Sequence, residues 1–221
     1  MDKKVSLISP ILNESSIMGD ALSNLESFVQ KIPLRWQWVL ANSGNDPGLK
    51  DLKSDKIELK ILNLPPKTNR AQALQKALKA SDGDYIAIMP VDFTIPLAEL
   101  FSFLQELVTA DDVDIAIGNR YTAKKVMQSQ KSSWHQTLEK IINEKHRHLP
   151  QTDVLCSYMI FRRSALDKLL PELNLKAWYY SLDILKLAQA KQLKVIQVPV
   201  LSRDKRISKI PLLREYLRHL F

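Results

Sequence analysis

Apolar positions along the chain recur in two different spacings, and the two kinds of segment alternate. Short runs of consecutive apolar residues, such as 5–9 and 85–89, are typical of strands buried on both faces of a sheet. Longer segments carry apolar residues three and four positions apart, which is typical of helices with one buried face. We predict strands at 5–9, 36–41, 57–62, 85–89, 113–117, 158–161 and 195–198, and helices at 19–29, 71–78, 97–108, 132–146 and 181–190.

The alternation predicts an α/β fold with a mostly parallel central sheet and helices on both faces. A chain of 221 residues is long enough to bury one core, so we expect a single domain. We assign residues 1–202 to its body and 203–221 to a basic C-terminal tail of the same domain. The tail has apolar residues at helical spacing beside Arg214 and Arg218, so this amphipathic helix docks either on the core or on an anionic membrane surface.

The composition is basic, with 32 Lys and Arg against 24 Asp and Glu and a formal net charge of +8. Such a balance attracts nucleic acids, acidic membrane faces or phosphorylated small molecules. Nucleic acid is not the expected partner, because no tract interleaves basic and aromatic residues. The first apolar run is too short for a signal peptide, and Cys156 is the only cysteine, so we expect a cytoplasmic protein with Cys156 in its core.

Polar residues follow several predicted strands, at the place where an open α/β sheet binds its ligands. Asn13 and Glu14 come after the first strand, and Asn42 comes after the second. Asp92 follows the fourth strand and Arg120 the fifth. Since parallel strands end at one edge of a sheet, the sequence predicts a single polar site there.

Several short motifs occur in order along nearly the whole chain. They are residues 9–14 (Ser-Pro-Ile-Leu-Asn-Glu), 83–89 (Gly-Asp and an apolar strand), 117–121 (Ile-Gly-Asn-Arg-Tyr), 153–163 (from an aspartate to two arginines), 198–200 (Val-Pro-Val) and 208–209 (Ser-Lys). Each motif is weak alone, but their order and spacing resemble the inverting family-2 glycosyltransferases of GT-A fold. The resemblance is closest to the dolichyl- and polyprenyl-phosphate sugar transferases.

The resemblance implies roles for individual residues. The family's acidic triplet, which holds Mg2+ or Mn2+ against the donor diphosphate, corresponds here to Pro90-Val91-Asp92, so Asp92 is the expected metal ligand. One carboxylate can serve magnesium, because phosphate oxygens and water complete its coordination. The implied catalytic residues are Asp92 and Asp183; the nucleotide-sugar ligands are Pro10, Asn13, Glu14, Asn42, Asn69, Arg70 and Asp92; the acceptor-phosphate ligands are Arg120, Lys131, Arg203, Arg206 and Lys209.

The implied reaction moves a sugar from a nucleotide sugar to a polyprenyl or dolichyl phosphate, or a related anionic acceptor, with inversion. A phosphate monoester, with a second pKa of about 6, is largely ionised at neutral pH, so no strong general base is needed. For an acceptor with a hydroxyl group, Asp183 is the leading general base. A lipid acceptor implies peripheral contact with the cytoplasmic membrane face.

Two departures from the family pattern leave a second hypothesis open. Asn42 replaces an aspartate that helps to read the nucleotide base, and residues 67–71 replace a glycine-rich approach to the phosphates. The alternative is a catalytically degenerate family member that binds a nucleotide, a glycan or a protein partner, with Asp92 as a turn or cap residue. Four further basic residues are expected at the solvated surface: Arg162, Arg163, His146 and His148.

Overall fold

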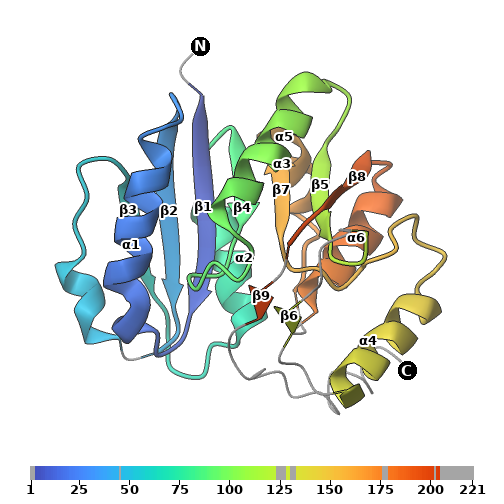
Figure 1. Ribbon diagram of the computed structural model, residues 1–221, viewed down its shortest axis with the longest axis horizontal. Helices are drawn as coiled ribbons and strands as arrows, with labels where there is room; N and C mark the ends of the chain where they lie inside the picture. The colour runs from blue at the N-terminus through green and yellow to red at the C-terminus, as the bar shows by residue number, and fades with distance from the viewer. Residues whose placement is uncertain are drawn as a thin grey trace.

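The apolar runs of the sequence pair side by side into one seven-stranded sheet in the computed structural model of the chain (Figure 1). The structure describes residues 3–44, 46–122, 128–129, 133–175, 179–201 and 203–204. The strands of this sheet are β1 (Lys4–Ile11), β2 (Arg35–Asn42), β3 (Glu58–Asn63), β4 (Tyr85–Ile88), β5 (Ile115–Asn119), β7 (Met159–Arg162) and β8 (Val195–Pro199). Two short strands, β6 (Gln128–Ser129) and β9 (Arg203–Asp204), form a separate parallel pair.

Helices cover both faces of the sheet, with α1 and α3 toward the viewer in Figure 1 and α2 behind. Their apolar stripes close the core; Leu100, Phe103 and Leu107 of α3, for example, are fully buried. The helical segments are α1 (Ser15–Val29), the 3-10 helix η1 (Pro47–Asp51), α2 (Arg70–Ala80), α3 (Leu97–Thr109), α4 (Ser133–Lys145), α5 (Arg163–Leu169) and α6 (Tyr180–Ala190).

The strand order is β3-β2-β1-β4-β7-β5-β8, and every neighbouring pair is parallel except those that include β7. The predicted α/β fold with a mostly parallel sheet and helices on both faces is confirmed. All eight residues of β1 are buried, which explains its uninterrupted apolar run. Cys156 is buried, as predicted.

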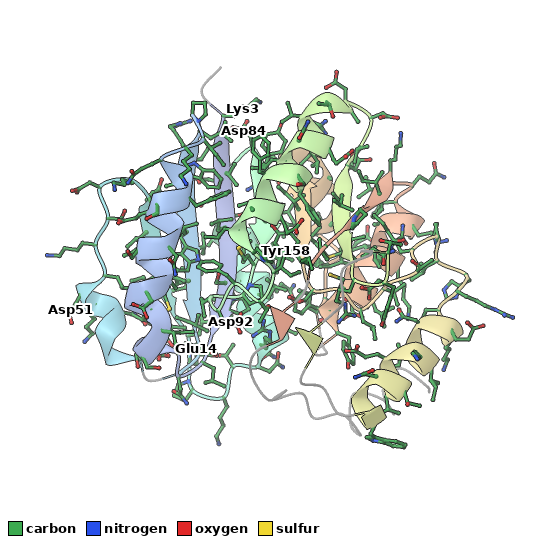
Figure 2. The ribbon with its side chains drawn as sticks, in the orientation of Figure 1. Lys3, Glu14, Asp51, Asp84, Asp92 and Tyr158 are labelled. Carbon is green, nitrogen blue, oxygen red and sulfur yellow. The ribbon has the colours of Figure 1, made fainter. Side chains whose placement is uncertain are left out.

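The two ends of the strands define two edges of the sheet. Figure 2 shows Lys3 and Asp84 at the edge where the parallel strands begin, which we call the amino edge, and Glu14 and Asp92 at the opposite, carboxyl edge. Because β7 runs against its neighbours, its first residues lie at the carboxyl edge. The carboxyl edge is thus formed by strand ends, the start of β7 and the N-termini of α1, α2 and α6.

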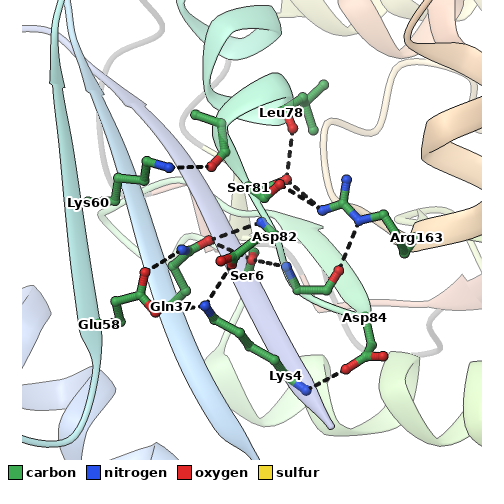
Figure 3. Close-up of polar contacts among 12 residues, drawn as sticks. Lys4, Ser6, Gln37, Glu58, Lys60, Leu78, Ser81, Asp82, Asp84 and Arg163 are labelled. Atoms are coloured by element: carbon green, nitrogen blue, oxygen red, sulfur yellow. Dashed lines mark hydrogen bonds and ion pairs between the residues drawn. The ribbon is translucent and has the colours of Figure 1, made fainter.

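A network of charged and amide groups ties the amino edge together (Figure 3). Lys4 Nζ lies 2.6 Å from Glu58 Oε2 and 2.7 Å from Asp82 Oδ1. Gln37 donates to Glu58 over 2.7 Å and accepts from Ser6 Oγ over 2.8 Å. The hydrogen bonds from Lys4 lower the pKa of both Glu58 and Asp82.

Two arginines that we expected at the solvated surface are instead anchors, so that expectation is wrong. Arg163 donates from Nε to Gly83 O and from Nη2 to Ser81 O, each over 3.0 Å (Figure 3). Arg162 donates in the same way to Val113 O over 2.6 Å and to Ala110 O over 3.0 Å. Both guanidinium groups satisfy carbonyls at chain turns distant in sequence, which periodicity does not reveal.

Other local expectations also changed. The helix α5 was not predicted, because its seven residues give too short an apolar repeat to distinguish from a loop. His146 was expected to be exposed, yet it is 5% exposed, and burial lowers its pKa to about 4.

Within the described residues, none of the helices has the length and apolar character needed to cross a membrane. The amphipathic tail lies almost wholly outside the described residues, so its docking stays a prediction.

Candidate active site

Asp92 lies in a turn at the carboxyl edge whose backbone is held by buried groups. Trp38 Nε1 donates to Ser9 Oγ over 2.9 Å, and Ser9 Oγ donates to Met89 O over 2.6 Å. Phe93 stacks on Trp38 with ring centroids 6.4 Å apart and takes a positive φ of 45°. Asp92 Oδ1 accepts from Thr94 N over 3.3 Å, and its side chain is half-buried. The turn therefore presents a carboxylate at a fixed position after the end of β4.

A buried aspartate, Asp46, holds the loop between β1 and α1. Its two oxygens accept from Asn13 N and Ser15 N, each over 2.9 Å. Asn13 has a positive φ of 54°. A Cβ on Gly44 would lie 2.8 Å from the backbone nitrogen of Asn13, so only glycine fits at position 44. Glu14, at the start of α1, makes no side-chain cap bond to the helix. Asp46 thus fixes the loop that carries two predicted ligands, a role that the sequence did not reveal.

The ends of β2 and β3 carry a pair of amides. Asn42 and Asn63 are opposite each other in the strand register, and Asn42 Nδ2 donates to Asn63 Oδ1 over 3.2 Å. Asn42 Oδ1 accepts from Gly44 N over 3.0 Å, and Asn42 is only 5% exposed. Asn63, which was not predicted as a site residue, is exposed. Its only signal in the sequence was its position at a strand end.

The N-termini of α2 and α6 meet at a corner of the same edge. Asn69 forms a capping box with Gln72 at the start of α2, where Arg70 is the first helical residue. Burial raises the pKa of Tyr180, while the charge of Arg70 and its hydrogen bond to the hydroxyl lower it. Tyr180 also donates to Ser157 O over 3.3 Å, and Asp183 lies in the first turn of the same helix. The structure thus brings Arg70 close to the helix that carries Asp183.

Arg120 lies in a buried charge cluster. Its Nε and Nη2 donate to the two oxygens of Asp153, each over 2.8 Å, and its Nη1 lies 3.7 Å from Glu139 of α4. Burial lowers the pKa of Arg120, but the charge and hydrogen bonds of Asp153 raise it well above its ordinary value. This guanidinium therefore ties β5 to α4. Of the other predicted phosphate ligands, Lys131, Arg206 and Lys209 lie outside the described residues, and only the backbone of Arg203 is described.

The carboxyl edge can hold a metal ion only if the nucleotide sugar supplies some of the ligands. Among the residues that the structure describes, no three His, Cys, Asp or Glu side chains form a group able to hold a metal. Pro90 leaves Asp92 as the one carboxylate in the turn after β4. One protein carboxylate with diphosphate oxygens and water is a donor set that magnesium accepts.

Solved structures with this fold include sugar transferases. A glucosyl-3-phosphoglycerate synthase from Mycobacterium tuberculosis, in complex with Mn2+ and UDP-glucose, matches 98% of the chain and 76% of its own length, with a TM-score of 0.66 and 16% identity. The mannosyltransferase PcManGT from Pyrobaculum calidifontis, in complex with GDP-mannose and Mn2+, matches 100% and 62%, with a TM-score of 0.63 and 14% identity. At these identities the likeness shows the fold alone.

Two relatives that resemble this chain in sequence have the names of sugar-transferring enzymes. A dolichyl-phosphate beta-glucosyltransferase of Trichomonas vaginalis is 21% identical over 211 residues, which are 88% of this chain and 62% of that protein. A dodecaprenyl-phosphate galacturonate synthase of Rhizobium johnstonii is 25% identical over 187 residues, 79% of this chain and 54% of that protein. The chain thus spans less than two thirds of the length of either relative. The model of glycosyl transferase family 2 matches residues 6–170, most of the chain, and the chain therefore belongs to this family.

Proposed function

We propose that this chain transfers a sugar from a nucleoside-diphosphate sugar to a polyprenyl phosphate, with inversion at the anomeric carbon. The observation that carries the proposal is the fixed, half-buried carboxylate of Asp92 at the carboxyl edge of a family 2 domain. The names of the relatives, which refer to dolichyl and dodecaprenyl phosphates, support the acceptor class.

The reaction is a single displacement. A phosphate oxygen of the acceptor attacks the anomeric carbon and forms the new C–O bond, while the bond from that carbon to the donor diphosphate breaks. The nucleoside diphosphate leaves with the electron pair. Because the acceptor monoester is already largely ionised at neutral pH, no side chain has to remove a proton. The protein contributes position and charge, and the electrostatic term is the largest one expected.

Two groups of this chain are assigned to the leaving diphosphate. Asp92 would hold Mg2+ or Mn2+ together with phosphate oxygens, and the ion when bound would neutralise charge on the leaving group. Arg70 would add a cationic donor at the N-terminus of α2, where backbone N–H groups also favour anions. Asp183 is proposed to contact the donor sugar.

The acceptor phosphate needs cations of its own. Lys131, Arg203, Arg206 and Lys209 are proposed for this task, together with peripheral contact at a membrane surface. Arg120, which follows β5, is proposed to add positive charge near the acceptor phosphate. In this structure it also donates to both oxygens of Asp153. Trp134 and Ile141 are exposed apolar residues on α4, the helix that Arg120 contacts through Glu139. They support an apolar surface, such as that of a membrane, as the neighbour of α4.

The test is a transfer assay with labelled nucleotide sugars and polyprenyl phosphate in vesicles, run alongside thermal unfolding with each nucleotide, with and without Mg2+ or Mn2+. We expect labelled lipid as product, and metal-dependent stabilisation that disappears in Asp92→Ala. Asp20→Ala, at an exposed position of α1, is the matched control and should behave as the parent. If no nucleotide sugar shifts the unfolding midpoint at millimolar concentration and no lipid is labelled, the proposal is wrong.

A further inference from the structure

The strand β3 is an outer strand of the sheet, and within the described residues no strand pairs with the side that faces away from β2. Leu64 N donates to Asn42 O of β2 over 2.8 Å, so the even-numbered residues of β3 direct their backbone groups toward β2. The odd-numbered residues direct theirs outward. Among the residues that the structure describes, nothing hydrogen-bonds the outward N–H and C=O groups of Leu59 and Ile61. The strand therefore presents an open ladder to another strand.

The side chains of β3 form two different faces. Leu59 and Ile61 are half-buried, whereas Glu58 and Lys60 are exposed on the opposite face (Figure 3). Charged residues on an outer strand usually prevent pairing with other chains, but here the two charges are of opposite sign. The outer strand at the other side of the sheet, β8, ends in Pro199, whose missing N–H limits pairing there. Of the two outer strands, β3 is thus the one suited to a partner.

The charges select one register for the pairing of β3 with β3 of a second copy. Two identical antiparallel strands are related by a two-fold axis, which passes through one residue of β3 if the outward backbone groups are to meet. An axis at Glu58 or at Lys60 would place like charges opposite each other, which is destabilising. An axis at Ile61 would place Lys60 opposite the apolar Leu62. An axis at Leu59 places Glu58 opposite Lys60 of the second copy, twice by symmetry.

In the register centred on Leu59, the backbone and the side chains agree. The two Leu59 residues exchange N–H···O bonds, and each Ile61 N–H faces the carbonyl of Ile57 in the other copy. Apolar residues are thus opposite apolar residues. Ile57 N is already bonded to Ser54 Oγ over 3.1 Å, so the ladder ends there. The pairs of opposite charge fall at the non-hydrogen-bonded positions, where side chains of the two strands lie closest.

Glu58 and Lys60 can pair with a second copy without losing their present contacts. Lys60 Nζ donates to Ala80 O over 2.9 Å, and an ammonium group has two further N–H groups. Glu58 accepts from Lys4 and Gln37, one on each oxygen, and each carboxylate oxygen has a second lone pair. The Glu58 side chain is 54% exposed. The new ion pairs would therefore extend the network of the amino edge.

We propose that this chain forms a symmetric dimer in which the β3 strands of two copies pair antiparallel about Leu59 and join the two sheets into one. The inference goes beyond the proposed function and does not depend on it. In the order β3-β2-β1-β4, two strands lie between β3 and the strand that precedes Asp92, so the pairing leaves both proposed sites open. Because the paired strands run in opposite directions, the two carboxyl edges face opposite ways. One planar membrane then serves one site of the dimer at a time.

The test is sedimentation velocity of the full chain, from low micromolar to near-millimolar concentration. We expect the mass to rise with concentration from 25.3 kDa toward twice this value, because a single strand pair is a small interface and the dimer is weak. The association should weaken as the salt concentration is raised, since two exposed ion pairs contribute to it. Lys60→Glu places two carboxylates opposite each other and should raise the dissociation constant by at least about ten-fold.

Exchange of the two charges gives a result that misfolding cannot produce. Glu58→Lys alone should also prevent association, because it places two ammonium groups opposite each other. A mixture of the Lys60→Glu and Glu58→Lys chains has opposite charges at both positions and should associate about as tightly as the parent. Ile61→Pro removes an outward N–H without a change in charge, which an outer strand tolerates, and should weaken association as well. Lys76→Glu, at an exposed position of α2, is the matched control.

The outcomes are distinct. A parent chain that stays monomeric at every concentration would overturn the inference. Association that persists unchanged in both Lys60→Glu and Ile61→Pro would also overturn it, because another surface would then join the copies. Recovery in the mixed sample, with the Lys76→Glu chain behaving as the parent, would support pairing through β3. Circular dichroism checks that each variant folds. No nucleotide or acceptor is present in these measurements, so a negative result leaves the proposed sugar transfer intact.

Discussion

The two edges of the sheet use polar residues in opposite ways. At the amino edge, Lys4 pairs with both Glu58 and Asp82 at 2.7 Å or less, so these opposite charges are bound to one another. At the carboxyl edge, Asp92 accepts from the backbone of Thr94 and Asn63 accepts from the amide of Asn42, which fixes each side chain beyond the end of its strand or at it. The first arrangement joins segments that are distant in sequence, while the second fixes side chains at the edge where we propose that the nucleotide sugar binds.

This difference teaches how to separate binding from stability in an α/β domain. Charge content does not distinguish the edges, because both carry aspartates and basic residues. The distinction lies in what the contacts join: at the amino edge they link β1 to β3 and to the loop after α2, whereas at the carboxyl edge they fix a side chain to the turn or strand beside it. Substitutions at the amino edge should therefore change the free energy of unfolding, and substitutions at the carboxyl edge should change ligand affinity and rate.

The largest expected effect is that of Asp92→Asn on sugar transfer. Removing the one carboxylate of the turn after β4 should lower kcat/KM by at least about 100-fold, the scale for loss of a group that stabilises charge in the transition state. The unfolding midpoint should stay within a few degrees of the parent, because Asp92 is half-buried and Asn can still accept from Thr94 N. Transfer kinetics and thermal unfolding on the same sample measure the loss of kcat/KM and the unchanged midpoint, respectively. A variant that loses stability and activity together would erase the contrast between the edges.

The second effect is at the amino edge, where Arg163→Met should destabilise the fold by about 2–4 kcal/mol. The substitution leaves the carbonyls of Ser81 and Gly83 without the donors that now satisfy them. Urea unfolding measures this change, and transfer activity per folded molecule should be unchanged. Arg147→Met is the control, since Arg147 is 81% exposed and its pair with Glu144 is worth at most about 0.5 kcal/mol.

A smaller and mixed effect is expected for Asp46→Ala, which tests where the contrast breaks down. Asp46 is buried and bonded to the backbone, as a stabilising residue is, yet it lies at the carboxyl edge and holds the loop that carries Asn13 and Glu14. Two backbone N–H groups would lose their acceptor, so we expect a loss of about 1–3 kcal/mol in unfolding free energy. Nucleotide affinity should fall as well, because Asn13 is no longer held at its positive φ. Asp46→Asn keeps one acceptor oxygen and should show about half of both changes.

The smallest effect is acid sensitivity at the amino edge. Hydrogen bonds from Lys4 hold the pKa of Glu58 and Asp82 below their ordinary values, so the unfolded chain binds protons first as the pH falls. Their contribution is present above about pH 4.5 and is lost as the pH falls through the lower folded values. Lys4→Met should flatten this decline by under about 1 kcal/mol, because both carboxylates are more than half exposed. Burial of His146 adds a pH dependence between pH 6.5 and about pH 4 that is the same in the parent and in Lys4→Met. It therefore cancels in the difference between their unfolding free energies.

Most of the fold was predictable from periodicity, and less of the site was. Fully buried strands such as β1 and amphipathic helices such as α3 give patterns that depend on local spacing alone. The antiparallel direction of β7 has no such pattern, because a buried strand reads the same in either orientation. Asp92 was predictable as a polar residue at a strand end. The clamp by Asp46 and the anchors of Arg162 and Arg163 join atoms between about thirty and eighty residues apart, which no local pattern encodes.

The place of β7 in the sheet has a consequence for how the chain matures on the ribosome. The strands β3, β2, β1 and β4 pair with one another and are complete once residue 88 has been made, so this half can assemble during synthesis. The side of β4 that pairs with β7 stays unpaired until residues 159–162 have been made, which happens only after β5 and α4. Until that moment an apolar strand with unpaired N–H and C=O groups is open to other nascent chains. A pause in translation between residues 90 and 160 should therefore favour aggregation more than a pause after residue 170.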